Sequence, residues 1–131
     1  MIPKYIIGDI VMYDNKIHTI MNTLGVNNYE LSYISHPVHQ LELSGVPITP
    51  KIFKKNGWKF LKHHKRNSYY DVSWDSYHKP AETNISLRFY QEEKAFFPFL
   101  YAQEISEKPI RYIHQLQHLL FGLGLNSEME V

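Results

Sequence analysis

The sequence predicts an α+β fold in which two antiparallel β-meanders are each followed by a helix. Short runs of β-branched and aromatic residues alternate with turn residues over most of the chain, which contains 10 Tyr and 7 Phe. One short segment has helix start and stop signals, and one longer segment near the C-terminus has a helical apolar period. Runs of strands separated by single helices favour this class over a parallel βαβ arrangement.

The first meander is expected over residues 1–46. Asp14-Asn15-Lys16 indicates a tight turn, because Asn and Asp tolerate the left-handed backbone region. Three strands with such turns are compatible with a curled sheet of SH3-like type, which needs a further element to pack against. The strands expected here are residues 5–13, 17–22, 29–33 and a short one at 40–43.

A short helix is expected within residues 47–57. Thr49 is a good N-cap, Pro50 suits the first helical position, and Asn56-Gly57 is typical of a helix end. Ile52 and Phe53 would form the buried side of this helix.

The second meander is expected over residues 58–105. Ile85, Leu87 and Phe89 alternate with polar neighbours, which predicts a strand with one face exposed to water. Pro98 lacks an amide hydrogen and indicates an edge position or a bulge. The strands expected here are residues 69–74, 84–90 and 96–104.

The C-terminal helix is expected over residues 108–124, with Pro109 in its first turn and its apolar side packed on a sheet. Arg111, His114 and His118 would then face away from the core and form a polar stripe. The apolar residues that recur at three- and four-residue steps are Ile113, Leu116, Leu120 and Leu123.

The composition limits the classes of protein to which the chain can belong. Its 131 residues predict a single domain. The absence of cysteine excludes disulfides, thiol catalysis and cysteine-ligated zinc, and fits a cytoplasmic protein. No apolar run approaches the about 18 residues that a membrane span needs. The net charge of +1 says nothing about partners, although its distribution does.

Residues 51–66 carry seven Lys or Arg and no acid. Aromatic residues are interleaved with these cations, and this combination suits ligands that carry phosphate and a flat ring. The alternative is a solvated surface around a short helix. The ligand-binding residues predicted from this segment and its continuation are Lys55, Trp58, Lys59, Lys62, Arg66 and Tyr69.

The predicted stripe of Arg111, His114 and His118 adds three candidates for binding an anion. The same residues could instead pair with an acid from the strands. Two His four residues apart can share a metal, but Gln115 stands where zinc peptidases have their Glu, and no third ligand is evident. We therefore predict neither a metal nor a cofactor. We expect His114 and His118 to be hydrogen-bonded imidazoles at the boundary of the core.

No nucleophile elbow, phosphate-binding glycine loop or dinucleotide fingerprint is present in the sequence. The close carboxylate pairs, Asp71 with Asp75 and Glu92 with Glu93, fall in strand or turn contexts. The expectation is a protein that is not an enzyme.

Three segments carry a resemblance that spans almost the whole chain. Residues 7–13 resemble the pattern IGNLVYY, residues 47–58 resemble PLTEEILLKNGF, and residues 112–121 resemble YVHQLQNLYF. These patterns occur in a group of small uncharacterised proteins from gut Bacteroidales genomes, prophages and phages. The resemblance implies a phage or mobile-element accessory protein in the cytoplasm of the host, and no site residues. His118 departs from the pattern, which often has Asn there.

Three functions are compatible with these observations. The first is binding and sequestration of an anionic small ligand, such as a nucleotide immune signal, by a phage counter-defence protein. The second is a protein-interaction module that inhibits or recruits a host factor. The third is an accessory protein associated with nucleic acid, which chain-wide near-neutrality disfavours. If the protein assembles, a two-fold dimer is the default arrangement.

Overall fold

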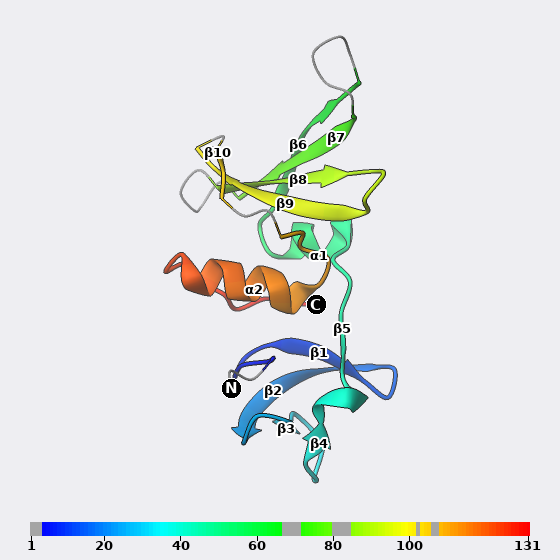
Figure 1. Cartoon of the computed structure of the whole chain (residues 1–131), viewed down its shortest axis with the longest axis vertical. Coiled ribbons are helices and arrows are strands. Elements are labelled where there is room, and N and C mark those ends of the chain that lie inside the picture. Colours follow the sequence, from blue (N-terminus) through cyan, green and yellow to red (C-terminus); the bar gives the residue numbers. More distant parts are fainter. Residues whose placement is uncertain (1–3, 67–71, 80–84, 102, 106–107) are drawn as a thin grey trace. The chain divides into compact units, whose positions relative to one another are not determined.

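The computed structural model describes residues 4–66, 72–79, 85–101, 103–105 and 108–131, and it confirms the predicted α+β class with two antiparallel meanders. The chain divides into two compact units. Unit 1 comprises Met1–Pro47 and Tyr112–Met129, and unit 2 comprises Ile48–Arg111 and Glu130–Val131. Each unit contains one five-stranded sheet and one of the two α-helices (Figure 1). That residues 1–131 form a single domain stays a prediction.

The sheet of unit 1 has the strand order β4-β3-β2-β1-β5, and its neighbouring strands are antiparallel. The turn between β1 and β2 is the predicted one, since Asp14 and Asn15 have φ values of 50° and 60°. The strands are β1 (Ile10–Tyr13), β2 (Lys16–Leu24), β3 (Asn28–Leu31), β4 (Val38–His39) and β5 (Ser44–Gly45).

The core cluster of unit 1 is formed by its sheet and the segments beside it, and α2 (Ile113–Gly122) packs near β1. Ile113, Leu116 and Leu120 are fully buried, so the apolar period of the helix identifies its buried face correctly. Leu123 is 37% exposed because the helix ends before it. Residues of the sheet side that form the core cluster are Tyr5, Val11, Ile20, Tyr29, Leu31, Val38 and Leu43.

The start of the C-terminal helix was predicted too early, at residue 108. Ile110 and Phe96 exchange both backbone hydrogen bonds, at 2.8 and 2.9 Å, so residue 110 is extended. Tyr112 forms a bridge with Pro47 and is the N-cap of α2. Pro109 therefore lies before the helix. Backbone pairing with distant strands outweighs the local helical signal over this segment.

The strand predicted at residues 40–43 is wrong. Residues Gln40–Glu42 form a 3₁₀ turn, η1. His39 caps this turn by accepting the Leu41 amide at Nδ1, and the Glu42 carboxylate accepts the His39 amide. Such local side-chain bonds to the backbone offer it an alternative to a strand ladder.

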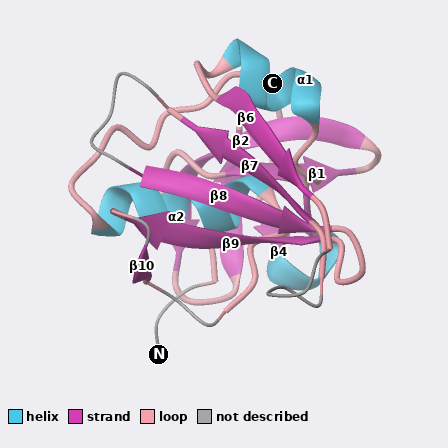
Figure 2. Ribbon diagram, turned by 90° about the horizontal axis from the view of Figure 1, so that it is seen from above, coloured by secondary structure: helices cyan, strands magenta, loops and turns pink. Residues whose placement is uncertain are grey.

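The sheet of unit 2 has the order β10-β9-β8-β7-β6, so β6 is an edge strand (Figure 2). Of the strand predicted at residues 69–74, residues 69–71 lie outside the described part of the chain, and β7 begins at Trp74. The strands are β6 (Lys59–His64), β7 (Trp74–His78), β8 (Ile85–Tyr90), β9 (Ala95–Leu100) and β10 (Gln103–Glu104).

Pro98 lies in β9, one strand from the edge. The Ile105 amide donates to the Pro98 carbonyl, and the Phe96 backbone bonds point to the same side, toward Ile110. The nitrogen of Pro98, which has no amide hydrogen, therefore points toward the short strand β10 and away from the long ladder with β8. The proline is tolerated because no ladder bond to β8 is lost.

The short helix predicted within residues 47–57 is α1 (Pro50–Lys55). Thr49 Oγ1 accepts the Ile52 amide at 3.2 Å, as expected for the N-cap. Gly57 has a φ of 80°, which explains the glycine after the helix end. Phe53 is the buried residue of this helix, and Ile52 is half-buried.

Candidate functional site

A pocket of about 550 Å³ lies in unit 2 between α1 and the edge strand β6. Its volume falls in the range typical of small-molecule sites. Its walls are largely aromatic, and two lysine side chains lie among its lining residues. The residues that line the pocket are Pro50, Phe53, Lys54, Gly57, Trp58, Lys59, Phe60 and Tyr77.

Aromatic packing positions the walls of this pocket. The Phe53 ring lies 5.4 Å from Trp58, 5.0 Å from Tyr77 and 5.0 Å from Phe96, measured between ring centroids. The turn at Gly57 brings the chain back, so that the Trp58 amide donates to the Phe53 carbonyl at 2.9 Å. The walls are therefore fixed by a helix, a turn and two strands rather than by a long loop.

The walls contain two polar groups, one of which is buried out of reach of the pocket. Trp58 is 3% exposed, and its Nε1 has no acceptor in the part of the chain that the structure describes. Burial raises the pKa of the Tyr77 hydroxyl, and the Asp75 carboxylate raises it further. Tyr77 is therefore a neutral hydroxyl at pH 7.

The lysines of the basic segment are exposed around this pocket or along β6. Lys54 and Lys59 line it, and Lys62 lies further along the same strand. Lys55 instead donates to the carbonyl of Val131 at 3.2 Å. Arg66 follows β6, where its amide donates to Ser73 Oγ. Tyr69, also a predicted ligand-binding residue, lies outside the described residues.

A hydrogen-bonded His–Asp pair lies on β6 and β7. His63 Nδ1 is 2.5 Å from Asp75 Oδ1, and Gln91 Nε2 donates to Asp75 Oδ2 at 2.9 Å. Asp75 and Tyr77 share one face of β7, since they are two residues apart. The acid nearest to Tyr77 in sequence therefore already has two hydrogen-bond partners, which reduces its repulsion of an anion.

The predicted stripe of Arg111, His114 and His118 is wrong. Arg111 precedes α2 and belongs to unit 2, whereas both histidines belong to unit 1. His114 is 5% exposed and packs edge-on against the Tyr5 ring at 5.0 Å, so it faces the core and not solvent. Burial lowers the pKa of His114 to about 4, which leaves this imidazole neutral at pH 7.

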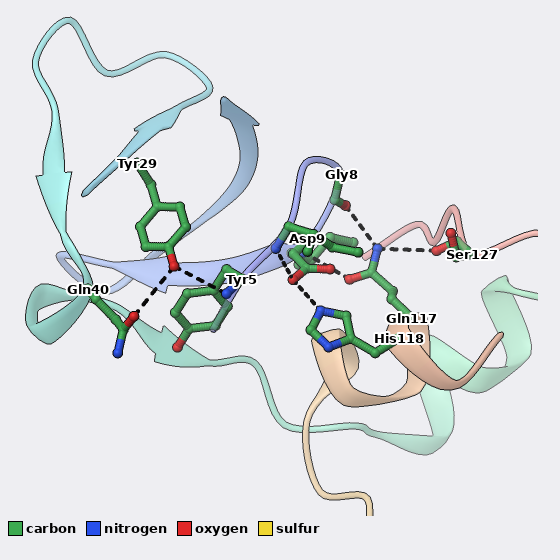
Figure 3. Close-up of polar contacts among 10 residues, drawn as sticks. Tyr5, Gly8, Asp9, Tyr29, Gln40, Gln117, His118 and Ser127 are labelled. Atoms are coloured by element: carbon green, nitrogen blue, oxygen red, sulfur yellow. Dashed lines mark hydrogen bonds and ion pairs between the residues drawn. The ribbon is translucent and has the colours of Figure 1, made fainter. Parts of the chain in front are cut away.

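His118 is bound to a buried carboxylate that the sequence analysis did not single out. Its Nε2 is 2.6 Å from Asp9 Oδ2, and the same oxygen accepts the Ile6 amide at 2.9 Å (Figure 3). Asp9 is 1% exposed, whereas the His118 side chain is 35% exposed. The His114 and His118 rings are 5.8 Å apart. Among the described residues, no group of three His, Asp or Glu could hold a metal.

Gln117 holds the start of β1 to α2 and to the following segment. Its Oε1 accepts the Ile10 amide at 2.9 Å, and its Nε2 donates to the carbonyls of Gly8 and Ser127 at 2.9 and 3.2 Å. It is 4% exposed. Figure 3 shows the Gln117 amide between the Gly8 turn and Ser127, beside the Asp9–His118 pair.

Two signals in the sequence could have identified these residues. Asp9 is an acid inside the apolar run of residues 6–12, and an acid in a buried strand needs a partner. Gln117 falls on the stripe of Ile113, Leu116 and Leu120, which places a polar side chain on the buried face of the helix.

Comparison of the chain with protein-family models, curated proteins and solved structures gives no match. Among the described residues, no helix is both long and apolar enough to cross a membrane.

Proposed function

We propose that unit 2 binds an anionic small molecule that carries a flat ring, such as a nucleotide, in the pocket between α1 and β6. The observation that carries this proposal is the combination of an aromatic pocket with lysines among its lining residues. The ring of the ligand packs on Phe60, which is 57% exposed, and its phosphate meets Lys54 and Lys59. Base–aromatic stacking contributes about 1–3 kcal/mol per base, so this contact supplies much of the affinity.

The donors of the walls fit the same ligand class. The neutral Tyr77 hydroxyl can donate to an oxygen or a ring nitrogen of the ligand. Lysine binds phosphate as a point charge, and the absence of acids over residues 51–66 keeps the local field positive. A neutral or cationic ligand of the same shape would gain nothing from these lysines.

In this proposal the protein does not transform its ligand but sequesters it. The resemblance to phage and prophage proteins suggests the setting, which is the cytoplasm of a bacterial host in which a nucleotide serves as an immune signal. A binding protein present in excess over such a signal would lower its free concentration and thereby act as a counter-defence factor.

Isothermal titration calorimetry against a panel of cyclic and linear nucleotides tests the proposal. The double variant Lys54→Ala/Lys59→Ala removes both lining cations and should weaken binding about tenfold, because exposed charge contacts contribute about 0.2–1 kcal/mol each. Lys16→Ala, on an exposed position of β2 in unit 1, is the matched control and should leave binding unchanged. Heat from no member of the panel, or equal affinity of the double variant, would reject the proposal.

A second function, docking of a protein partner, is favoured by the exposed edge of the same sheet. Phe60 and Leu61 of β6 are 57% and 58% exposed, and in the described part of the chain β6 pairs with β7 alone. An extended peptide can add to such an edge through main-chain hydrogen bonds. Leu61→Lys would weaken the binding of a protein partner and leave nucleotide binding intact, since Leu61 is not among the residues that line the pocket. Pull-down with both forms distinguishes the two functions.

A further inference from the structure

Unit 1 has a pocket of its own, of about 300 Å³, between the segment before β1 and the last turn of α2. Its apolar lining comes from Ile6, Ile7 and Phe121, and its charged lining comes from Asp9 and Glu128. Ile7 and Phe121 are 63% and 66% exposed, so they offer apolar surface at the rim. The described residues that line it include no Lys, Arg or His, although His118 nearby is bonded to Asp9 Oδ2. The lining is therefore acidic, whereas that of the pocket in unit 2 is basic.

The buried carboxylate in this pocket has an unused acceptor. Both hydrogen bonds that Asp9 receives from described side chains and amides, from Ile6 and His118, go to Oδ2. Oδ1 receives none from the described residues. An ionised carboxylate can accept about four hydrogen bonds, and a buried one is costly unless it is paired. Asp9 lines the pocket and its Oδ1 is not among the fully buried atoms, so a donor that enters the pocket can meet Oδ1.

The Gln117 amide of the pocket does not compete for this donor. The Gln117 amide is already bonded to Ile10, Gly8 and Ser127. Glu128 is exposed and adds a second negative charge. A ring such as that of Phe121 attracts a cation over its face. The pocket thus combines a carboxylate with one unbonded oxygen, a second acid and apolar walls. This combination favours a cation that carries a hydrocarbon part.

We propose that this pocket binds a small organic cation, namely a primary ammonium group on a short alkyl or aryl chain. The ammonium group donates to Asp9 Oδ1, and the hydrocarbon part packs on Ile7 and Phe121. This inference goes beyond the proposed function of unit 2, because it concerns another unit, another pocket and the opposite ligand charge. The two proposals can therefore fail independently.

Titration with n-butylammonium and phenethylammonium, followed by the amide signals of Gly8 and Glu128 in ¹H–¹⁵N NMR spectra, tests this site. Butyrate and n-butanol are the matched probes, with the wrong charge and with no charge. Saturable shifts of both amides with the two ammonium probes, and none with butyrate or n-butanol, are expected. Equal responses to n-butanol, or no saturable response to either ammonium probe, would overturn the proposal.

Variants separate the carboxylate from the walls. Asp9→Asn keeps an acceptor for the Ile6 amide but removes the charge, and should weaken ammonium binding at least about tenfold. Glu30→Gln, on an exposed position of β3, is the matched control and should bind as the wild type does. If Asp9→Asn does not fold, Glu128→Gln and Phe121→Ala test the site instead, since both residues are exposed and their replacement should not disturb folding. Both variants should bind the ammonium probes more weakly. Wild-type affinity in these variants would refute the assignment.

Discussion

Replacement of Gln117 by Ala should destabilise unit 1 strongly, because this side chain satisfies three backbone groups. The Ile10 amide loses its acceptor at 2.9 Å, and the Gly8 carbonyl loses its donor at 2.9 Å. An unsatisfied buried donor or acceptor costs about 1–3 kcal/mol. Gly8 is exposed and Ser127 is half-buried, so water can replace these two bonds at little cost. The unsatisfied Ile10 amide remains, and the expected loss of unfolding free energy is about 1–3 kcal/mol.

Urea unfolding and amide hydrogen exchange measure this loss in different ways. Urea reports the free energy of unfolding, while exchange at Ile10 reports the one amide that depends on Gln117 directly. Gln103→Ala is the matched control, because Gln103 is an exposed residue of β10 in unit 2. A loss below about 1 kcal/mol together with unchanged exchange at Ile10 would refute the reasoning, since the amide would then need no side-chain acceptor.

Three further predictions concern burial and close packing. The pKa of His114 is about 4 in the folded protein, below the unfolded value of about 6.5. The stability that the neutral imidazole contributes is therefore intact above pH 6.5 and is lost as the pH falls toward 4, by up to about 3 kcal/mol. His114→Phe should flatten the pH dependence of the stability measured by urea unfolding over this range. The buried Tyr5 hydroxyl has no partner among the described residues, so Tyr5→Phe should be neutral or stabilising in thermal melts. Tyr29→Phe should destabilise the protein by about 1 kcal/mol, because the Tyr29 hydroxyl accepts the Tyr5 amide, and a larger loss for Tyr5→Phe would contradict this. A methyl group on Gly45 would lie 2.4 Å from the Tyr112 ring, so Gly45→Ala should lower the melting temperature. Gly122→Ala meets open space in α2 and should raise the melting temperature, and the reverse order would show that the Tyr112 ring moves aside freely.

Local signals predicted most elements of the fold correctly. The caps of α1, the Asp14–Asn15 turn and the buried face of α2 all depend on residues close in sequence. The failures occurred where distant chain segments determine the local conformation. Residues 108–112 look helical, yet Ile110 pairs with Phe96 and Tyr112 pairs with Pro47. No local pattern reports a partner that lies 14 or 65 residues away in the sequence.

The candidate sites divide in the same way. The basic, aromatic segment was recognised from the sequence because its residues are contiguous, and Trp58 and Lys59 do line a pocket. The Asp9–His118 pair was missed because its residues are 109 positions apart.

The junction between the two units has a consequence for the modularity of the protein. Pro47 and Tyr112 are bridge partners in unit 1, and in unit 2 the Ile48 amide donates to the Arg111 carbonyl at 3.3 Å. Residues 48–111 thus form an insertion whose two ends lie side by side. Antiparallel segments can be joined by a two-residue hairpin, so excision of residues 48–111 leaves ends that a short linker can close. We therefore expect unit 1 to keep its fold when residues 48–111 are excised, whereas unit 2 also uses Glu130 and Val131, which hydrogen-bond to Asn56 and Lys55.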